Sequence, residues 1–363
     1  MTKKKVLVIF GTRPEAIKLA PVIKELEKSS NIFRPYVCVT AQHREMLDQV
    51  LEIFNITPDF DLDLMTSCQE LSKLSAEILN TLKSVIDKVK PDIIIVQGDT
   101  TTTFIASLVG FYSKVKIGYV EAGLRSFNKH SPYPEEINRQ LTSVLADVYF
   151  APTKVSRKNL IKENIPKNKI HITGNTIVDS VKFIKKNYIQ KSNKSNKSIL
   201  VTVHRRENWG KNLISVCQAV KKIAELYPEY TIIWPVHLNP VVKDIIYKNL
   251  SNIPNIKLMY PLNYLKFMEY LNSSILILTD SGGVQEEATV LGKPTLLLRD
   301  TTERPEALQS GTVKQVGCNA KKILMEVKKL LNRKSYYKKV AKKNNVFGDG
   351  NAAKKICKIL AKL

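Results

Sequence analysis

The sequence predicts an α/β protein with two Rossmann-like, doubly wound parallel sheets, each in a domain of its own. Short apolar runs alternate with amphipathic segments from one end of the 363-residue chain to the other. Strands that alternate with helices form parallel sheets with helices on their faces. A chain of this length also exceeds what one ordinary hydrophobic core accommodates, which favours two domains.

The expected elements follow from two patterns: short apolar runs bounded by turn residues indicate buried strands, and apolar residues three or four apart indicate helices. The expected strands are residues 6–10, 36–40, 93–96, 117–120, 148–151, 170–173, 199–203, 231–234, 256–259, 275–278, 295–298 and 313–316. The expected helices are residues 14–29, 70–89, 101–113, 135–146, 153–163, 211–226, 239–250, 263–271, 283–291, 319–331 and about 350–361.

A polar stretch divides the two series of elements. Residues 187–198 are rich in Lys and Asn and lack hydrophobic periodicity, which is typical of a linker. We therefore expect a first domain at 1–186, the linker at 187–198 and a second domain at 199–349. The final segment, 350–363, is expected to form a helix that packs back toward the first domain.

Composition limits the class of protein. No apolar run reaches transmembrane length, and the five cysteines are scattered without Cys-x-x-Cys spacing, so we expect a cytoplasmic protein with no membrane partner. The net charge of +24 suggests nucleic-acid binding. However, the lysine-rich segments 185–197 and 321–363 carry no nucleic-acid-binding motif, so we expect a solvated basic surface and no nucleic-acid partner.

Arginine is concentrated in the unusual motifs of a chain that otherwise uses lysine. A planar guanidinium binds phosphate or carboxylate through two hydrogen bonds, so this distribution predicts an anionic small-molecule ligand. The arginines in these motifs are Arg13, Arg44, Arg125, Arg139, Arg205, Arg206, Arg299 and Arg304.

The strongest candidate for an anion site follows the apolar run 275–278. There, Thr279-Asp-Ser-Gly-Gly leads into a helical pattern, so unpaired N–H groups and a partial positive charge face the turn. The residues Ser281–Gly283 let a phosphate approach the backbone closely, and Arg304 on the next loop could add its guanidinium. An ordinary helix with Ser281 as its N-cap explains this segment equally well on its own.

Acidic side chains mark the first domain at three places. Asp99 follows the expected strand 93–96, Glu121 follows the strand 117–120, and Glu135 begins a helix. Asp99 has an ordinary explanation as an N-cap, and Glu135 has one as a complement to a helix dipole. Because doubly wound sheets bind ligands beyond the carboxyl ends of their strands, we expect the three carboxylates to face the cleft between the domains and to do acid–base work.

Basic residues at other strand ends are further candidates. Arg13 and Lys18 follow the first strand, and His204 lies before two arginines after the strand 199–203. Solvated surface charges and a structural histidine are the alternatives. No G-x-G-x-x-G motif and no metal-ligand spacing occur, so we expect neither a nicotinamide cofactor nor a bound metal.

These motifs together resemble one family, the bacterial non-hydrolysing UDP-N-acetylglucosamine 2-epimerases, which have a glycosyltransferase-B type of fold. Relatives that act on diacetamido-uronate sugars have Gly-Ala-Arg-Pro-Gln in the first turn, whereas this chain has Gly-Thr-Arg-Pro-Glu, which favours UDP-N-acetylglucosamine. The resemblance covers nearly the whole chain and is carried by GTRPEAIKLAPVI (11–23), TAQHREMLDQVL (40–51), QGDTTTT (97–103), EAGLRS (121–126), PYPEEINRQLT (132–142), ITGNTIVD (172–179), HRREN (204–208), PVHLNP (235–240), DSGGVQEEA (280–288) and GKPTLLLRDTTERPEA (292–307).

The resemblance implies a role for each candidate residue. Asp99, Glu121 and Glu135 would be the acid–base carboxylates, assisted by His204. Phe267 would lie near the uracil and Glu287 at the ribose hydroxyls. The residues that would bind the UDP-sugar are Arg13, Lys18, Phe267, Ser281, Gly282, Gly283, Glu287 and Arg304.

The resemblance also implies regulation and assembly. A second UDP-N-acetylglucosamine would act as an allosteric activator at Gln42, Arg205 and His237, although some members have glutamine where this chain has Glu45. The enzyme would be a homodimer that needs no cofactor, and its product would supply N-acetylmannosamine units for cell-surface polysaccharide.

The implied mechanism is elimination and re-addition. A carboxylate removes the C2 proton while UDP leaves C1, and UDP and a proton then return to the 2-acetamidoglucal to give the manno epimer. Two other functions stay open: a glycosyltransferase of the same architecture, which would need one base and an acceptor groove, and a binder of nucleotide-sugars or nucleic acid without turnover.

Overall fold

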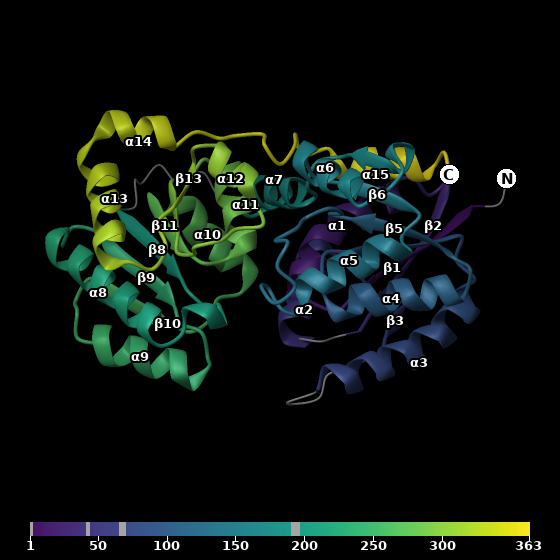
Figure 1. The fold of residues 1–363 in the computed structure, drawn as a ribbon, viewed down its shortest axis with the longest axis horizontal. Coiled ribbons are helices and arrows are strands. Elements are labelled where there is room, and N and C mark those ends of the chain that lie inside the picture. Colours follow the sequence, from purple (N-terminus) through teal and green to yellow (C-terminus); the bar gives the residue numbers. More distant parts are fainter. Residues whose placement is uncertain (1–2, 41–43, 65–69, 190–196) are drawn as a thin grey trace. The chain divides into compact units, whose positions relative to one another are not determined.

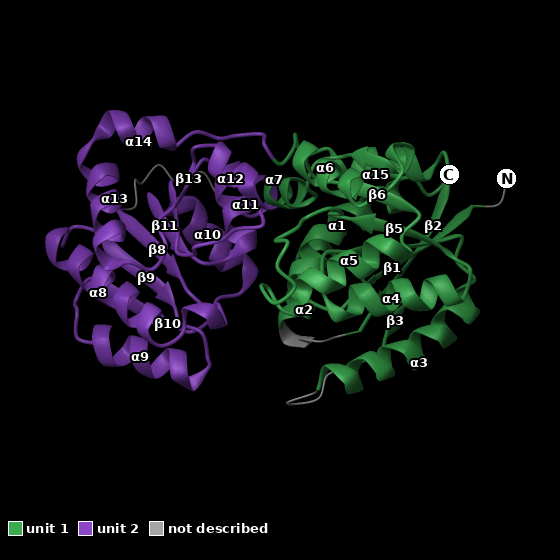
Figure 2. Cartoon of the chain, viewed as in Figure 1, with its two compact units in different colours: residues 1–183, 347–363 green, residues 184–346 purple. Residues whose placement is uncertain are grey.

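The computed structural model describes residues 3–40, 44–64, 70–189 and 197–363. The chain divides into two compact units, as Figure 2 shows. Unit 1 comprises Met1–Phe183 and Phe347–Leu363, and unit 2 comprises Ile184–Val346. Each contains one parallel sheet with helices packed against it, so the predicted class of two doubly wound α/β domains is confirmed (Figure 1).

In the described part of unit 1, seven parallel strands form one sheet with β1 and β4 at its centre. The chain builds outward from β1 in one direction and from β4 in the other, which is the doubly wound arrangement. In sheet order the strands are β3 (Phe60–Asp61), β2 (Phe33–Val39), β1 (Lys4–Phe10), β4 (Ile93–Gln97), β5 (Lys116–Val120), β6 (Val148–Ala151) and β7 (Ile170–Ile172).

Helices pack on both faces of this sheet. Helices α3, α4 and α5 lie side by side, whereas α1 contacts α2 and α15 (Figure 1). The bounds are α1 (Arg13–Lys28), α2 (Arg44–Phe54), α3 (Leu71–Val89), α4 (Thr101–Tyr112), α5 (Glu135–Leu145), α6 (Lys154–Lys162), α7 (Ile177–Asn187) and α15 (Ala352–Leu360).

Unit 2 repeats the plan with six parallel strands among its described residues, and β8 and β11 are the central pair. In sheet order the strands are β10 (Ile256–Met259), β9 (Thr231–Pro235), β8 (Ser198–Thr202), β11 (Leu276–Thr279), β12 (Thr295–Leu297) and β13 (Val313–Gln315). The helices are α8 (Lys211–Leu226), α9 (Pro240–Leu250), α10 (Tyr264–Ser273), α11 (Gly282–Leu291), α12 (Pro305–Gln309), α13 (Ala320–Asn332) and α14 (Lys334–Val340).

The central strands are covered on both faces, which explains their unbroken apolar sequences. In β1, residues Val6 to Phe10 are all 0% exposed, and Leu276 to Leu278 of β11 are equally buried. A strand of a parallel sheet buries both sets of its alternating side chains, so polar residues are excluded until the strand ends. This places the polar motifs at the carboxyl edges of the two sheets.

The last segment of the chain belongs to unit 1. The Asp179 carboxylate accepts hydrogen bonds from the backbone N–H groups of Ala352 and Ala353, at 3.2 and 3.1 Å, at the start of α15. At the other end of this helix, Lys4 Nζ donates to the Leu360 carbonyl at 2.9 Å. Within the described ranges, no helix is long and apolar enough to cross a membrane.

Candidate active site

Glu121, directly after β5, is the most tightly held carboxylate of the predicted set. It is 5% exposed. Its backbone has a φ of 64°, which residues other than glycine rarely adopt, and this conformation turns the chain sharply at the end of the strand. Lys18 Nζ and Asn175 Nδ2 donate to its Oε1, the latter at 2.8 Å, and Gln97 Nε2 donates to its Oε2. Three donors from three different segments therefore hold this side chain at the carboxyl edge of the sheet.

Asp99 lies at the end of the neighbouring strand, β4. Its carboxylate accepts a hydrogen bond from Arg139 Nη2 at 2.5 Å, and its backbone carbonyl accepts one from Asn138 Nδ2 at 3.0 Å, both from α5. The N-cap of α4 is Thr100, whose Oγ1 accepts from a backbone N–H, so Asp99 is not the cap of this helix. Its partly exposed carboxylate is available for chemistry.

Glu135 begins α5, one helical turn before Arg139, so the two residues share a face of that helix. Its neighbour Glu136 is 0% exposed and accepts hydrogen bonds from the backbone N–H groups of Ser126 and Phe127, at 2.9 and 3.1 Å. Glu136 thus fixes the loop after β5, whereas Glu135 stays partly exposed. Asp99, Glu121 and Glu135 all lie at the carboxyl edge of the unit 1 sheet.

Glu15 is a structural carboxylate below this edge. It is 2% exposed and accepts hydrogen bonds from the backbone N–H groups of Gly11 and Thr12 and from the hydroxyls of Thr12, Thr100 and Thr103. Burial raises its pKa despite these bonds. Glu15 therefore joins the β1–α1 turn to the start of α4 and aligns the two loops that carry Arg13 and Asp99.

In unit 2, the predicted anion site lies at the start of α11. Ser281 occupies the N-cap position but makes no side-chain cap bond, so the alternative of an ordinary side-chain cap does not hold here. A Cβ at Gly282 would lie 2.5 Å from Nη1 of Arg304, whereas a Cβ at Gly283 would meet nothing within 4 Å. The missing side chain at Gly282 therefore makes room for the guanidinium of Arg304, whereas the missing side chain at Gly283 leaves open space beside the helix end.

Arg304 is held beside this helix end by carboxylates. Its Nε donates to Glu286 Oε1 and its Nη1 donates to Glu303 Oε1, both at 2.5 Å. Glu303 also accepts a hydrogen bond from Arg299. The loop after β12 therefore carries a buried series of ion pairs in which arginines and glutamates alternate. The guanidinium is thus fixed next to Gly282 before any ligand binds.

His204 is oriented by Asp280, a residue of the motif DSGGVQEEA (280–288) whose role its position in the sequence does not indicate. Asp280 is 0% exposed, and its carboxylate accepts the backbone N–H groups of His204 and Arg205 and Nδ2 of Asn208. Its Oδ1 also lies 3.3 Å from His204 Nδ1. If Nδ1 carries the proton and faces Asp280, Nε2 of this half-exposed ring can accept a hydrogen bond from a ligand.

The predicted uridine-binding residues lie on neighbouring helices. Glu287 on α11 is 5% exposed and accepts a hydrogen bond from the hydroxyl of Tyr264 on α10 at 2.7 Å. Phe267, one turn further along α10, is half-buried. This pair of helices therefore holds both residues within unit 2.

The remaining predicted residues are divided between the units. Arg13 begins α1, and Lys18 on the same helix is the residue that bonds Glu121. Of the expected activator residues, Gln42 lies outside the described residues, Arg205 has a buried Nε without a hydrogen-bond partner, and His237 accepts a hydrogen bond from Asn239 N at 3.1 Å.

One interpretation of the sequence is wrong for Arg125. The arginines in the motifs were expected to face an anionic small molecule, but the side chain of Arg125 is 0% exposed and binds both carboxylate oxygens of Glu163, at 2.6 and 2.7 Å. Arg139, Arg299 and Arg304 also bind carboxylates of this protein. The arginine bias therefore reflects internal ion pairs as well as ligand recognition.

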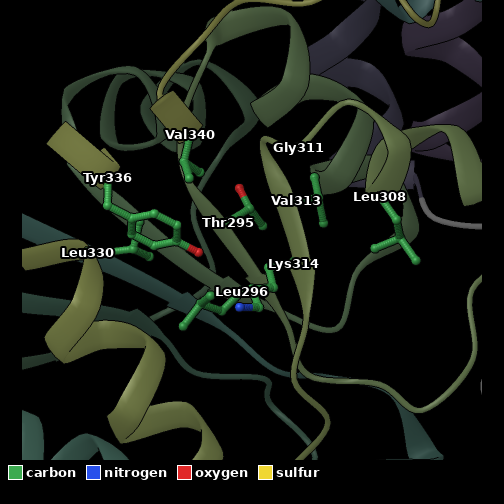
Figure 3. Close-up of a pocket in the computed structure, with 9 residues that line it drawn as sticks. All are labelled: Thr295, Leu296, Leu308, Gly311, Val313, Lys314, Leu330, Tyr336 and Val340. Atoms are coloured by element: carbon green, nitrogen blue, oxygen red, sulfur yellow. The ribbon is translucent and has the colours of Figure 1, made fainter. Parts of the chain in front are cut away.

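A separate cavity of about 190 Å³ in unit 2 is lined by residues of β12 and β13 and of the helices α12, α13 and α14 (Figure 3). Its lining is largely apolar and includes Leu296, Val313 and Tyr336. None of the predicted site residues lines it. The candidate site is therefore distinct from this cavity.

The two sites define a class of enzyme. Unit 1 offers several carboxylates at one sheet edge, which suits proton transfer, and unit 2 offers a helix N-terminus with an arginine beside it, which suits a phosphate. Together with two Rossmann-like domains, they define an enzyme that moves protons on a phosphate-bearing substrate.

Comparison with known proteins identifies the family. The model of the UDP-N-acetylglucosamine 2-epimerase family matches residues 24–361. The UDP-N-acetylglucosamine 2-epimerase of Yersinia pestis is 48% identical over 369 residues, which cover 98% of this chain and 98% of that protein. The chain belongs to the UDP-N-acetylglucosamine 2-epimerase family, so the resemblance inferred from the motifs is confirmed.

Solved structures agree with this assignment. The crystal structure of UDP-GlcNAc 2-epimerase from Neisseria meningitidis bound to UDP-GlcNAc has a TM-score of 0.93 and 46% identity, covering 99% of this chain and 100% of that chain. The Methanocaldococcus jannaschii enzyme in complex with UDP-GlcNAc and UDP has a TM-score of 0.85 and 35% identity, covering 99% and 100%. A kitacinnamycin glycotransferase, 8% identical with a TM-score of 0.65, shares the fold alone.

Proposed function

We propose that this chain interconverts UDP-N-acetylglucosamine and UDP-N-acetylmannosamine without a cofactor. The observation that carries the proposal is the pair of carboxylates Asp99 and Glu121, which follow the adjacent parallel strands β4 and β5 in a chain of this family. Adjacent strand ends supply the two proton-transfer groups that epimerisation requires. The product would supply N-acetylmannosamine units for cell-surface polysaccharide.

Elimination makes the C2 proton removable. No carbonyl lies next to C2, so simple deprotonation would be far too slow. In our mechanism a carboxylate takes the C2 proton, the C1–C2 double bond forms, and the C1–O bond breaks with its electron pair leaving on UDP. UDP then adds back at C1 while a second group protonates C2 from the opposite face. Asp99, Glu121 and Glu135 are the candidates for these transfers, with His204 assisting.

The leaving diphosphate needs positive potential. We assign it to the start of α11, where Ser281 leaves the helix end uncapped by a side chain and Gly283 leaves space for a phosphate oxygen. The helix dipole and the fixed guanidinium of Arg304 would stabilise the charge that develops as UDP departs. Arg13 would lie alongside the diphosphate, and Glu287 and Phe267 would hold the uridine.

One experiment tests the reaction directly. The purified protein is incubated with UDP-N-acetylglucosamine alone in D₂O and followed by proton and phosphorus NMR. We expect UDP-N-acetylmannosamine with deuterium at C2. Retention of hydrogen at C2, or no turnover unless an acceptor is added, would refute the mechanism, and the second outcome would favour the glycosyltransferase.

We also propose that a second UDP-N-acetylglucosamine activates the enzyme at Gln42, Arg205 and His237. The buried, unpartnered Nε of Arg205 supports this assignment, because a ligand oxygen would satisfy it. Arg205→Ala should change the sigmoidal dependence of rate on substrate concentration. An unchanged curve would remove Arg205 from the activator site.

We further propose that the enzyme is a cytoplasmic homodimer. The cytoplasmic location is supported by the free state of the cysteines in the described ranges. Dimerisation is supported by exposed apolar residues on the adjacent helices α4 and α5: Phe111, Tyr112 and Val144 are 58%, 63% and 78% exposed. Val144→Glu should give monomers in analytical ultracentrifugation, whereas Met325→Glu, a control in unit 2, should not. A dimeric Val144→Glu protein would exclude this surface.

A further inference from the structure

Asn175 lies between β7 and α7 and makes three hydrogen bonds in three directions. Its Nδ2 donates to Glu121 Oε1 at 2.8 Å, its Oδ1 accepts from the backbone N–H of Ile177 at 3.0 Å, and its own N–H donates to the carbonyl of Phe347 at 2.7 Å. The residue is 2% exposed. One buried residue thus connects a proposed acid–base carboxylate, the start of α7 and the C-terminal segment.

Both of these neighbouring segments are crossings between the units. The chain leaves unit 1 within α7, after Phe183, and returns to unit 1 at Phe347. Any change in the relative orientation of two domains must be absorbed by the segments that connect them. Asn175 therefore bonds Ile177, the first residue of the helix α7 through which the chain leaves unit 1. It also bonds Phe347, the first residue after the chain returns to unit 1.

The return crossing is fixed against the Asn175 loop at close range. Gly174 and Gly348 have φ angles of 91° and 112°, and a Cβ at Gly348 would lie 2.9 Å from the Cα of Gly174. The two backbones consequently pack without intervening side chains. A shift of residues 347–348 is thus transmitted to the loop that carries Asn175.

We propose that Asn175 is a positioning residue that couples Glu121 to the two crossings between the units. This inference rests on the proposed epimerase function, because it assumes that Glu121 transfers a proton. When the crossings are in place, the amide of Asn175 donates to the Glu121 carboxylate. A movement of either crossing weakens that donation and changes both the position and the proton affinity of Glu121, since a donor to a carboxylate favours its charged form.

The groups around Glu121 set the background for any effect of pH. Lys18 on α1 donates to it directly. Further ionisable groups near this corner are Asp99 after β4, Arg139 on α5, Tyr119 on β5 and Arg125. None of these residues is replaced in the variants proposed below, so a change in the pH profile reports the change made beside Glu121.

The first test replaces Asn175 with Asp. This side chain keeps the size of Asn175 and the acceptor for the Ile177 N–H but puts a carboxylate beside Glu121 in place of a donor. We expect kcat to fall by about 10- to 100-fold with KM for UDP-N-acetylglucosamine changed by less than about threefold. The kcat–pH profile should also move to higher pH by about one unit, because a like charge disfavours ionisation.

A matched control separates positioning from structure. The amide of Asn255 in unit 2 donates only to backbone carbonyls in the bonds described, those of Ala224, Tyr227 and Tyr230. Asn255→Asp makes the same chemical change away from Glu121. It should lower the melting temperature without moving the pH profile, and an equal profile shift in both variants would overturn the proposal.

The second test moves the crossing without touching either site. Gly348→Ala forces residues 347–348 away from Gly174, whereas Gly311→Ala, at a φ of 75° with nothing within 4 Å of the new Cβ, imposes backbone strain alone. We expect Gly348→Ala to lower kcat and to shift the pH profile as Asn175→Asp does, and Gly311→Ala to leave the profile unchanged. If Asn175→Asp does not fold, Gly348→Ala decides the question by itself.

The two levels of inference fail in different ways. If the wild-type enzyme does not epimerise UDP-N-acetylglucosamine, the proposed function is wrong. If the wild-type enzyme is active and the pH profiles of Asn175→Asp and Gly348→Ala match those of their controls, the function stands and the coupling through Asn175 is refuted.

Discussion

Two adjacent glutamates at the start of α5 have different surroundings. Successive residues of a helix point about 100° apart, so Glu136 turns into the protein while Glu135 remains partly exposed. A buried carboxylate requires donors, and Glu136 has the backbone N–H groups of Ser126 and Phe127 and the guanidinium of Arg139. Glu135, which stays partly exposed, is our candidate for proton transfer.

Glutamine substitutions at these two positions should therefore affect different properties: turnover at Glu135 and stability at Glu136. Glu135→Gln should lower turnover by about 100- to 10,000-fold with little change in melting temperature, because a proton-transfer group is lost. Glu136→Gln should destabilise the fold by about 3–5 kcal/mol, because it breaks a buried ion pair with Arg139. Turnover by NMR and thermal denaturation measure the two effects, and equal loss of stability in both variants would contradict the division of roles.

Alanine substitutions at the two glycines of α11 distinguish space for arginine from space for ligand. Gly283→Ala should fold with equal or greater stability, by up to about 1 kcal/mol, because alanine favours the helix and its Cβ meets no atom of the protein. It should nevertheless weaken UDP binding by tenfold or more if a phosphate occupies that space. Calorimetric titration with UDP gives the answer, and unchanged affinity would place the diphosphate elsewhere.

Gly282→Ala is the companion variant. Its Cβ would displace the guanidinium of Arg304 from its bonds with Glu286 and Glu303. We expect it to lower both the melting temperature and the affinity for UDP. A Gly282→Ala protein of normal stability would show that the Arg304 network tolerates rearrangement.

At the scale of elements, the sequence predicted strands better than helices. All the expected strands form, with ends that differ by a few residues, because buried apolar runs leave little ambiguity. The two-residue β3 and the short α12 and α14 were not predicted, since segments of that length show no periodicity. Helices α2 and α7 were missed although their apolar spacing is helical.

The candidate site was predictable in its residue types but not in its partners. Polar residues at strand ends pointed to Asp99 and Glu121, because parallel strands place those ends together. Gln97 lies in the motif QGDTTTT (97–103) and Asn175 in ITGNTIVD (172–179). Nothing in the spacing of these residues shows that both donate to Glu121. Asp280 likewise gave no signal of its own, since its task is to bind the backbone of the loop after β8.

The start of α15 depends on a carboxylate from another helix. Asn351, the N-cap of α15, makes no side-chain cap bond, and Asp179 on α7 accepts the first N–H groups instead. Asp179→Ala should destabilise unit 1 by about 1–2 kcal/mol and raise hydrogen exchange in 352–360. Asp349→Ala is the control, since that exposed carboxylate does not bond these N–H groups; equal exchange in both variants would contradict the capping role.

Asp179 also predicts a dependence on pH. Burial raises its pKa above the usual value, more than the hydrogen bonds lower it. A carboxyl group whose pKa is raised by folding stabilises the protein fully below its unfolded pKa, and this contribution is lost as pH rises through its folded pKa. The stability of the wild type relative to Asp179→Asn should therefore be higher at pH 4 than at pH 7 in urea titrations; the reverse trend would contradict the shift.

For the molecule as a whole, the thiols report the integrity of both units. Burial raises the pKa of Cys38, Cys217, Cys318 and Cys357 to about 12. At pH 8 only about one thiol in ten thousand at each position would be the reactive thiolate. An Ellman titration of the native enzyme should therefore detect at most one thiol, that of Cys68, which lies outside the described residues. The same titration in guanidinium, which unfolds the protein, should detect all five thiols. Fast reaction of two or more native thiols would contradict this burial.

The return of the chain to unit 1 has a consequence for biosynthesis. A ribosome completes the second domain before it makes α15, the helix that covers α1. Unit 1, although begun first, must wait for residues 352–360 to be synthesised before its surface over α1 is closed. Termination between Val346 and Ala352 would thus leave unit 2 complete and unit 1 without α15.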